Sequence, residues 1–310
     1  VLLNTHMDTV PPHVEFEREG GVIRGRGSCD AKGSLAAMVA AFQRFEPATA
    51  GDGDGASDGE GAAGVRLVVS PDEETDSRGL HDYLQEEDVE ADLAVVGEPT
   101  SLDVCTAARG RFEVDVGFEG EAAHAASGAG TSAISCAAEA VRRLEALEPM
   151  RDDLLGPSRL TVTRIAGGDA GNQVPADAEL FVDRRSVPPE TQDEFLALVD
   201  ETLADLDCDV DVRFSDRPTP FLEAFRTGED ESVVERFRAA VAEATGEETP
   251  VRPFDAACEG SYLAPHAPTV VFGPGAISED GEAVAHSERE YVPVDEVRMA
   301  ADALTRFLSG

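Results

Sequence analysis

The first hundred residues alternate between short apolar runs and segments with helical spacing of apolar positions. Residues 1–4 are largely apolar and predict a buried strand that ends at His6. Apolar positions three or four residues apart predict a helix over 33–45, with Pro47 just beyond its end. Further strands are predicted at 22–25, 65–69 and 93–96, and a helix at 79–86. Strands that alternate with helices favour an α/β fold with parallel strands.

The middle of the chain has a different pattern. Residues 112–118 alternate apolar and polar, which is typical of a strand with one buried face. The elements predicted after it are a helix at 132–147, strands at 160–165 and 179–183, a helix at 190–206 and a strand at 210–214. The order β-α-β-β-α-β suits a compact, ferredoxin-like α+β domain with its helices on one face.

The α/β pattern returns in the last third, with a helix at 231–245, a strand at 269–272 and a helix at 294–308. We therefore predict a discontinuous α/β domain over 1–106 and 216–310, with a mixed, mostly parallel sheet flanked by helices. A smaller domain over 107–215 would be inserted into it. Residues 48–64 are almost entirely Gly, Ala, Asp, Ser and Glu, which predicts a disordered acidic loop.

The chain has a formal net charge of -38, from 63 acidic and 25 basic residues, and Lys32 is its only lysine. Such a charge repels itself in dilute buffer, whereas molar salt shortens the Debye length to about 3 Å and screens it. An acidic surface that serves solubility is one interpretation; we favour adaptation to a salt-rich, halophilic cytoplasm. The sign of the charge disfavours nucleic acid and anionic membranes as partners.

The five cysteines are scattered and form no Cys-x-x-Cys pair, which predicts neither a disulfide framework nor a thiolate zinc site. We expect a reduced, cytoplasmic location. The sequence contains no apolar run of 18 residues that would predict a membrane span. It begins inside a predicted strand and without methionine, so we expect upstream residues to be missing.

Candidate catalytic side chains follow the ends of several predicted strands. His6 and Asp8, two residues apart on an extended segment, share one face, so Asp8 can orient the His6 ring for metal ligation; a surface ion pair is the alternative. Asp30 lies in a glycine-rich turn before a helix. A phosphate-binding loop has similar composition, but an aspartate repels phosphate and suits a carboxylate that bridges two cations better.

Adjacent acids at a strand end are costly unless a cation or a proton offsets their repulsion. Glu73 and Glu74 follow the strand at 65–69, and Glu98 follows the strand at 93–96. In a chain this acidic, a solvated surface is the alternative interpretation. His286 comes shortly after the last predicted strand and its glycine-containing turn.

Six segments in order resemble the di-zinc amidohydrolase and metallopeptidase family of acetylornithine deacetylase, succinyl-diaminopimelate desuccinylase, aminoacylase and glutamate carboxypeptidase. They are THMDTVPP at 5–12, GRGSCDAKG at 25–33, SPDEE at 70–74, VVGEPT at 95–100, GGDAGNQVPADAELFVDRR at 167–185 and FGPG…AHSEREYVP at 272–293. The resemblance implies a zinc-peptidase-like catalytic domain. The sequence also departs from the family pattern. Some tens of residues that family members carry before the first metal histidine are absent before His6, and a proline that is common after the lid histidine is missing after His124.

The resemblance also implies roles for individual residues. His6 and Glu98 would hold one divalent metal, Glu74 and His286 the other, and Asp30 would bridge them. Asp8 would orient His6, and Glu73 would be the general base. Zinc is the expected metal, with cobalt or manganese also compatible.

The inserted domain would be the family's lid and dimerisation domain, which makes a homodimer the expected assembly. By the same resemblance, His124 would stabilise the oxyanion, and Asn172, Arg185, Gly273 and Gly275 would contact or approach the substrate. The expected reaction is hydrolysis of the amide of an N-acyl amino acid, as in the two biosynthetic enzymes named first. A metallocarboxypeptidase or dipeptidase acting on short peptides is the alternative enzyme, and an inactive binding protein or fragment is the alternative from another class.

Overall fold

The computed structural model describes residues 1–46 and 64–310, and the loop predicted at 48–64 lies, except for Gly64, outside the described residues. The described chain divides into two compact units. The first comprises Val1–Ala108, Arg226–Phe254 and Cys258–Gly310, and the second Arg109–Phe225 and Asp255–Ala257. The expected boundaries of the inserted domain were 107 and 215.

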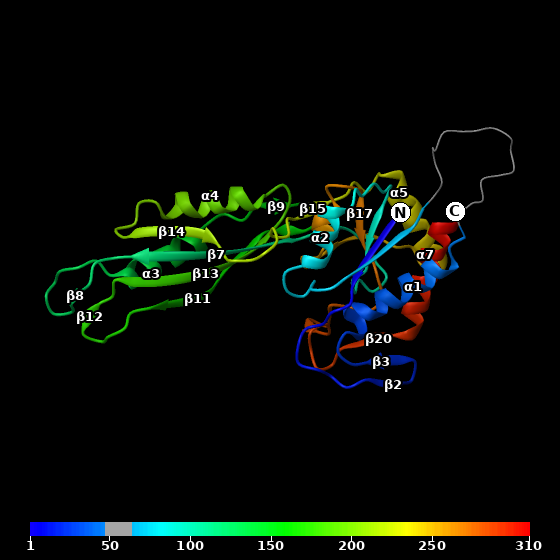
Figure 1. Cartoon of the computed structure of the whole chain (residues 1–310), viewed down its shortest axis with the longest axis horizontal. Helices are drawn as coiled ribbons and strands as arrows, with labels where there is room; N and C mark the ends of the chain where they lie inside the picture. Colours follow the sequence, from blue (N-terminus) through cyan, green and yellow to red (C-terminus); the bar gives the residue numbers. More distant parts are fainter. Residues whose placement is uncertain (47–63) are drawn as a thin grey trace. The chain divides into compact units, whose positions relative to one another are not determined.

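The first unit is built on a mixed sheet with the strand order β15-β6-β17-β5-β1-β4, to which β16 adds by pairing with β6 (Figure 1). Its strands are β1 (Leu2–His6), β4 (Arg66–Ser70), β5 (Ala94–Val96), β6 (Val104–Ala108), β15 (Phe225–Arg226), β16 (Val251–Phe254) and β17 (Thr269–Val271). β4, β1, β5 and β17 run parallel, whereas β6 is antiparallel to β17. The prediction of a mixed, mostly parallel sheet is confirmed.

Helices cover this sheet through a shared apolar core. The helices of the unit are α1 (Ser34–Arg44), α2 (Arg78–Glu86), α5 (Ser232–Thr245), α6 (Gly260–Leu263) and α7 (Val294–Ser309). Every residue of β1 is buried, as expected of a strand inside a parallel sheet. Phe237 of α5 packs edge-on against Phe272 and Phe307, with ring centroids 5.2 and 5.1 Å away. These contacts join the helices to the end of β17.

Short elements connect the catalytic segments of the first unit. The turn η1 (Ser28–Gly33) leads into α1, and β20 pairs with β3 in a three-stranded sheet. The strands outside the main sheet are β2 (Glu17–Glu19), β3 (Val22–Arg24), β18 (Ser278–Glu279), β19 (Glu282–Ala283) and β20 (Tyr291–Pro293). No helix in the described part of the chain is long and apolar enough to cross a membrane.

The second unit has the order β-α-β-β-α-β and an antiparallel sheet ordered β11-β13-β7-β14. Its main elements are β7 (Gly110–Glu119), α3 (Ala133–Glu145), β11 (Arg159–Gly167), β13 (Asp177–Ser186), α4 (Gln192–Leu203) and β14 (Asp209–Phe214). Both helices pack with the buried face of β7 in one core. This is the ferredoxin-like topology. Its short strands are β8 (Ala123–His124), β9 (Arg151–Asp152), β10 (Gly156–Pro157) and β12 (Gln173–Val174).

Cys136 of α3 and Cys208, just before β14, form a disulfide. The expectation of no disulfide was therefore wrong for this pair. The two cysteines are 72 residues apart in sequence, so only the packing of α3 near the start of β14 brings them together. Cys29, Cys105 and Cys258 are free and buried. The reduced, cytoplasmic location stays a prediction.

Candidate metal centre

The candidate ligands lie where parallel strands of the first unit end. His6 is the last residue of β1 and pairs in register with Ser70, the last residue of β4. Asn4 pairs with Val96 at the end of β5, two residues before Glu98. In open α/β sheets, the carboxyl ends of neighbouring parallel strands are the usual place for a site. The buried apolar runs that form these strands therefore deliver Asp8, Glu74 and Glu98 to one edge.

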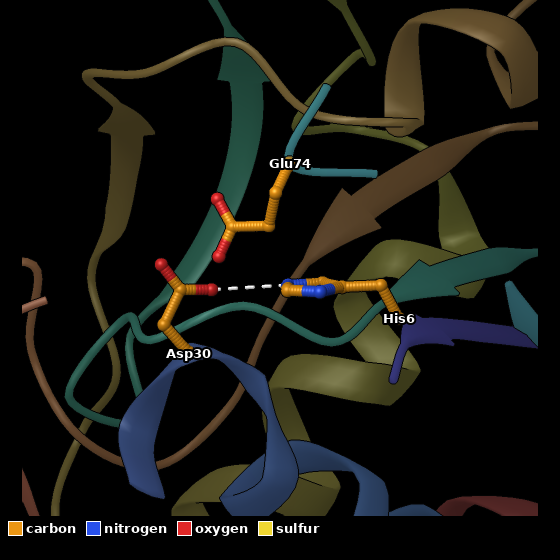
Figure 2. Close-up of side chains that lie close together, drawn as sticks. All are labelled: His6, Asp30 and Glu74. Atoms are coloured by element: carbon orange, nitrogen blue, oxygen red, sulfur yellow. Dashed lines mark hydrogen bonds and ion pairs between the residues drawn. The ribbon is translucent and has the colours of Figure 1, made fainter. Parts of the chain in front are cut away.

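His6 lies at the centre of the cluster, and only 1% of it is exposed. Its Nε2 atom is 3.0 Å from Asp30 Oδ1 and 3.9 Å from Glu98 Oε1. Its other ring nitrogen, Nδ1, is 3.6 Å from Asp8 Oδ1. Figure 2 shows the His6 ring and the carboxyl groups of Asp30 and Glu74 pointing toward one another. One nitrogen thus faces the carboxylates and the other faces Asp8.

Asp30 lies between two histidines. Its Oδ1 atom is 3.0 Å from His6 Nε2, and its Oδ2 atom is 3.0 Å from His286 Nε2. His286 Nε2 is in turn 2.9 Å from Glu74 Oε2. His286 has a φ of 62°, a left-handed conformation that is costly for a residue other than glycine and that is often found at functional sites. Each oxygen of Asp30 therefore has its own histidine.

Asp8 connects His6 to the turn that carries the two adjacent glutamates. Its Oδ1 and Oδ2 atoms accept the backbone N–H groups of Glu73 at 3.2 Å and Glu74 at 3.1 Å. Burial raises the pKa of Asp8, but the nearby His6 ring and the hydrogen bonds from these backbone groups lower it below its usual value overall. Asp8 is therefore held as a carboxylate that lies beside His6 and accepts the backbone of the glutamate turn.

The remaining carboxylates are crowded. Burial, together with the charges of Glu259, Asp30 and Glu74, raises the pKa of Glu73 to about 8, against the opposing effect of His6. Burial and the charge of Asp30 raise the pKa of Glu98 well above its usual value. The two histidines respond in the opposite direction. Burial lowers the pKa of His6, but its hydrogen bond with Asp30 and the nearby carboxylate of Asp8 raise it to about 12.

These side chains could hold a divalent cation. The ligand atoms of His6, Asp30 and Glu74 lie within 4.8 Å of one another, and those of His6, Glu73 and Glu98 form a second such group. Oε1 of Glu74 is buried without a hydrogen-bond partner in the part of the chain that the structure describes. Imidazole nitrogens and carboxylate oxygens are ligands that zinc accepts. Cations would neutralise the excess negative charge that raises the pKa values of Glu73 and Glu98.

Gly273, after β17, supports the Glu98 segment by close packing. A Cβ atom there would lie 2.2 Å from Ser34 Oγ and 2.5 Å from the backbone oxygen of Glu98. Its carbonyl accepts the N–H of Thr100 at 3.3 Å, and its N–H donates to Thr100 Oγ1 at 3.0 Å. This packing is a structural reason for glycine. Contact with substrate stays a prediction for Gly273 and for Gly275.

The other three predicted site residues belong to the second unit. The strands that carry His124 and Gln173 pair with each other, and the N–H of Ala125 donates to the carbonyl of Asn172 at 2.9 Å, so the structure brings His124 and Asn172 together. Arg185 is not brought to them. It lies near the far end of β13, where its Nε donates to Asp183 Oδ1 at 2.9 Å. Eight residues of strand between 177 and 185 span roughly 26 Å.

Three buried charged residues near the cluster were not predicted. Arg26 and Glu290 form an ion pair with 4% and 1% of their side chains exposed. Glu259 is also 1% exposed and accepts a hydrogen bond from Ser70 Oγ at 2.5 Å. Burial raises the pKa of Glu259 to about 7. Arg26 and Glu290 lie within the quoted motifs, but sequence alone does not distinguish a buried glutamate from the other acidic residues.

Comparison with known proteins places these motifs in a family. The family model described as peptidase family M20/M25/M40 matches residues 2–310. N-acetyl-L-citrulline deacetylase of Xanthomonas campestris pv. campestris is 31% identical, over 100% of this chain and 81% of that protein. An uncharacterised metallohydrolase of Methanocaldococcus jannaschii is 28% identical, over 96% of this chain and 78% of that protein.

The fold agrees with the sequence comparison. The aminopeptidase PepT of Bacillus cereus has a TM-score of 0.75 at 21% identity, and the match covers 99% of this chain and 79% of that one. At this identity the likeness concerns the fold, and the family assignment rests on the sequence matches above. The chain therefore belongs to the peptidase family M20/M25/M40 of metallohydrolases.

Proposed function

We propose that this chain hydrolyses the amide bond of an N-acyl amino acid with the help of two divalent cations, zinc in the first place. The observation that carries the proposal is the position of Asp30, whose two oxygens each lie 3.0 Å from a different histidine. Each histidine also has its own glutamate nearby, Glu98 for His6 and Glu74 for His286. A carboxylate placed between two histidine–carboxylate pairs is the arrangement that would suit two cations sharing one water, which supports the proposal.

The ligands divide accordingly. His6 and Glu98 would hold one cation, Glu74 and His286 the other, and Asp30 both. Two cations of this kind lower the pKa of a water and polarise the scissile carbonyl when bound. Asp8 fixes the orientation of the His6 ring, since it lies on the ring nitrogen that faces away from Asp30.

Glu73 is the proposed general base. Its carboxylate lies close to His6 and Glu98 but is not needed as a ligand of either cation. A carboxylate in this position can take the proton of the attacking water and pass it to the leaving amine. Burial raises its pKa in the metal-free chain to about 8, which is the direction that suits a residue carrying a proton between two steps.

The substrate proposal rests on sequence similarity and on charge. The relative that is 31% identical is named a deacetylase, which supports a deacylase over a carboxypeptidase or dipeptidase. We propose that Arg185 binds a substrate carboxylate. Because His124 and Asn172 lie together but away from Arg185, we propose that these two residues reach the substrate of the partner chain in a homodimer, where Asn172 contacts the substrate and His124 stabilises the oxyanion. The second unit would then be a lid through which two chains form a homodimer. A free side-chain amine would be drawn to an acidic pocket, which slightly favours ornithine, lysine or diaminopimelate derivatives as substrates.

A substrate panel in molar salt tests this proposal. We would measure turnover of N-acetyl-ornithine, N-succinyl-diaminopimelate, an N-acyl-lysine and simple dipeptides with added zinc or cobalt, and again with a chelator. Chelator-sensitive hydrolysis of an acyl amino acid is expected. Hydrolysis of dipeptides alone would replace the deacylase by a peptidase. Hydrolysis that survives complete removal of metal would contradict the two-cation site.

A further inference from the structure

A buried ion pair lies beside the proposed metal centre without belonging to it. The Nη1 atom of Arg26 is 2.7 Å from Oε2 of Glu290, and both side chains are almost completely buried. Taking two charges out of water costs free energy, which their attraction offsets only when the remaining donors and acceptors are also satisfied. Here the remaining donors and acceptors of Arg26 and Glu290 are satisfied by backbone groups of the segments that carry the candidate metal ligands.

The second oxygen of Glu290 holds the turn that carries the bridging aspartate. Oε1 accepts the backbone N–H of Cys29 at 3.2 Å and the backbone N–H of Asp30 at 3.3 Å. The N–H of Gly25, at the start of the same turn, donates to the backbone carbonyl of Glu290 at 3.1 Å. Glu290 thus fixes the backbone at the residue whose two oxygens face the two histidines.

Arg26 extends the same connection to two more segments. Its Nη2 atom donates to the backbone carbonyl of His286 at 3.3 Å, and its Nε atom donates to the carbonyl of Pro12 at 3.1 Å. Pro12 ends the segment that begins with His6 and Asp8. One ion pair therefore contacts the three segments that carry His6, Asp30 and His286.

The second unit contains a comparable pair that does none of this. Arg184 and Glu190 are 5% and 3% exposed, with contacts of 2.9 and 2.6 Å between them. The Arg184 guanidinium lies 5.1 Å from the centre of the Phe195 ring. This pair lies within the ferredoxin-like core and touches none of the three segments. Burial of an ion pair alone thus does not explain the contacts of Arg26 and Glu290.

We propose that Arg26 and Glu290 are positioning residues that hold Asp30 and His286 at the spacing needed for the second cation. This inference rests on the proposed function. The effect should be stronger at the His286–Glu74 position than at the His6–Glu98 position. His6 is fixed within β1, whereas His286 lies on a half-exposed segment whose backbone carbonyl is bound by Arg26.

The test is a zinc titration of the full chain in molar salt, followed calorimetrically and by metal content. Glu290→Gln removes the charge of Glu290 but keeps an acceptor oxygen. Arg26→Lys keeps the charge but loses the planar fork that reaches Pro12 and His286. Glu190→Gln and Arg184→Lys are the matched controls for zinc binding, because they break a similarly buried pair that is remote in sequence from the segments that carry His6, Asp30 and His286.

We expect the wild type to bind two zinc ions and both site variants to bind the weaker ion 10- to 100-fold less tightly, the range known for groups that orient metal ligands. The tighter ion should lose less affinity, because Asp30 serves both positions but His6 is also fixed within β1. The controls should lose thermal stability but keep both affinities.

Unchanged, wild-type zinc affinities in Arg26→Lys and Glu290→Gln would overturn this inference but not the proposed function. An equal loss of affinity in the controls would do the same. If Glu290→Gln does not fold, Arg26→Lys decides. A wild type that binds fewer than two ions would overturn the proposed function as well.

Discussion

Glu73 and Glu74 are neighbours in sequence but differ in their surroundings. Glu74 Oε2 is 2.9 Å from His286 Nε2, which suits a ligand. Glu73 lies near the other histidine, and burial raises its pKa to about 8. Adjacent carboxyl groups whose environments differ in this way can serve as ligand and as base. The backbone N–H groups of both residues donate to Asp8, which fixes the turn that carries the two side chains.

Replacing Glu73 by glutamine should abolish catalysis without removing metal. We expect kcat to fall by roughly 10² to 10⁴, because an amide cannot accept the proton of the attacking water. Metal content measured on the same sample should equal that of the wild type. Wild-type turnover with both cations bound would show that another group is the base.

Zinc affinity should increase with pH. In the metal-free protein, hydrogen bonds to Asp30 and Glu74 raise the pKa of His286 to about 10, against burial, and His6 has a pKa of about 12. Both rings therefore carry a proton at neutral pH and must release it to bind a cation. Calorimetry between about pH 6 and pH 8, in buffers of different ionisation enthalpy, would report this release.

The same shifts have a consequence for stability. Histidines with raised pKa values stabilise the metal-free fold below their unfolded pKa of about 6.5, and that stability is lost as the pH rises through about 10. The raised pKa of Glu73 has the same effect on stability. Above the pKa of Glu73 in the unfolded chain, folding must bury a charged carboxylate or bind a proton, so the metal-free fold loses stability as the pH rises toward about 8. The difference in Tm between the zinc-loaded and the metal-free chain should therefore widen with pH. A constant difference would contradict the protonation states described here.

At the scale of elements, the local pattern of apolar and polar residues was sufficient to predict a strand where only one face of that strand is buried. Val114 and Val116 alternate with Glu113 and Asp115, and this alternation became β7 with its buried and half-buried faces. β6 and β16 were not predicted. β6 contains small residues, and β16 contains Pro253, which cannot donate to a ladder; they form because they pair with each other across more than a hundred residues.

His6 and Glu98 could be singled out in the sequence because they lie just after apolar runs, whereas the ligand roles of the whole set came from the resemblance of six motifs to a known family. The partners of these ligands were not predicted. Glu290 is one of 63 acidic residues, and its burial follows from Arg26, which lies 264 positions away. The pairing of Cys136 with Cys208 was missed for the same reason. Contacts made only by tertiary packing leave no local signal.

Breaking this disulfide should destabilise the second unit. Closing a loop of about 70 residues restricts the unfolded chain, and such cross-links contribute roughly 2–4 kcal/mol. Cys136→Ser should lower the denaturation midpoint of the second unit under non-reducing conditions, followed by hydrogen exchange of β7 and β13. Cys105→Ser, which removes a free cysteine of the first unit, is the control. Equal midpoints for the wild type with and without reductant would argue that the bond contributes nothing.

At the scale of the whole molecule, we expect the net charge of -38 to determine how stability depends on salt. We propose that the fold is adapted to high salt, and so Tm should rise steeply as KCl increases from about 0.1 M to about 2 M, because the Debye length falls from about 10 Å to under 3 Å. Sucrose at matched osmolality controls for excluded-solute effects. A Tm that is insensitive to KCl would favour an acidic surface that serves solubility only.

The most direct test of the two-cation site is the number of zinc ions bound per chain in molar salt, measured on the wild type and on Asp30→Ala. Asp30 lies 3.0 Å from both histidines, so its loss should affect both positions. We expect two ions per wild-type chain, with N-acyl amino acid hydrolysis that follows their occupancy, and fewer than two in Asp30→Ala. A wild type that binds a single ion, or an Asp30→Ala chain that still binds two ions with unchanged affinity, would contradict the bridged site.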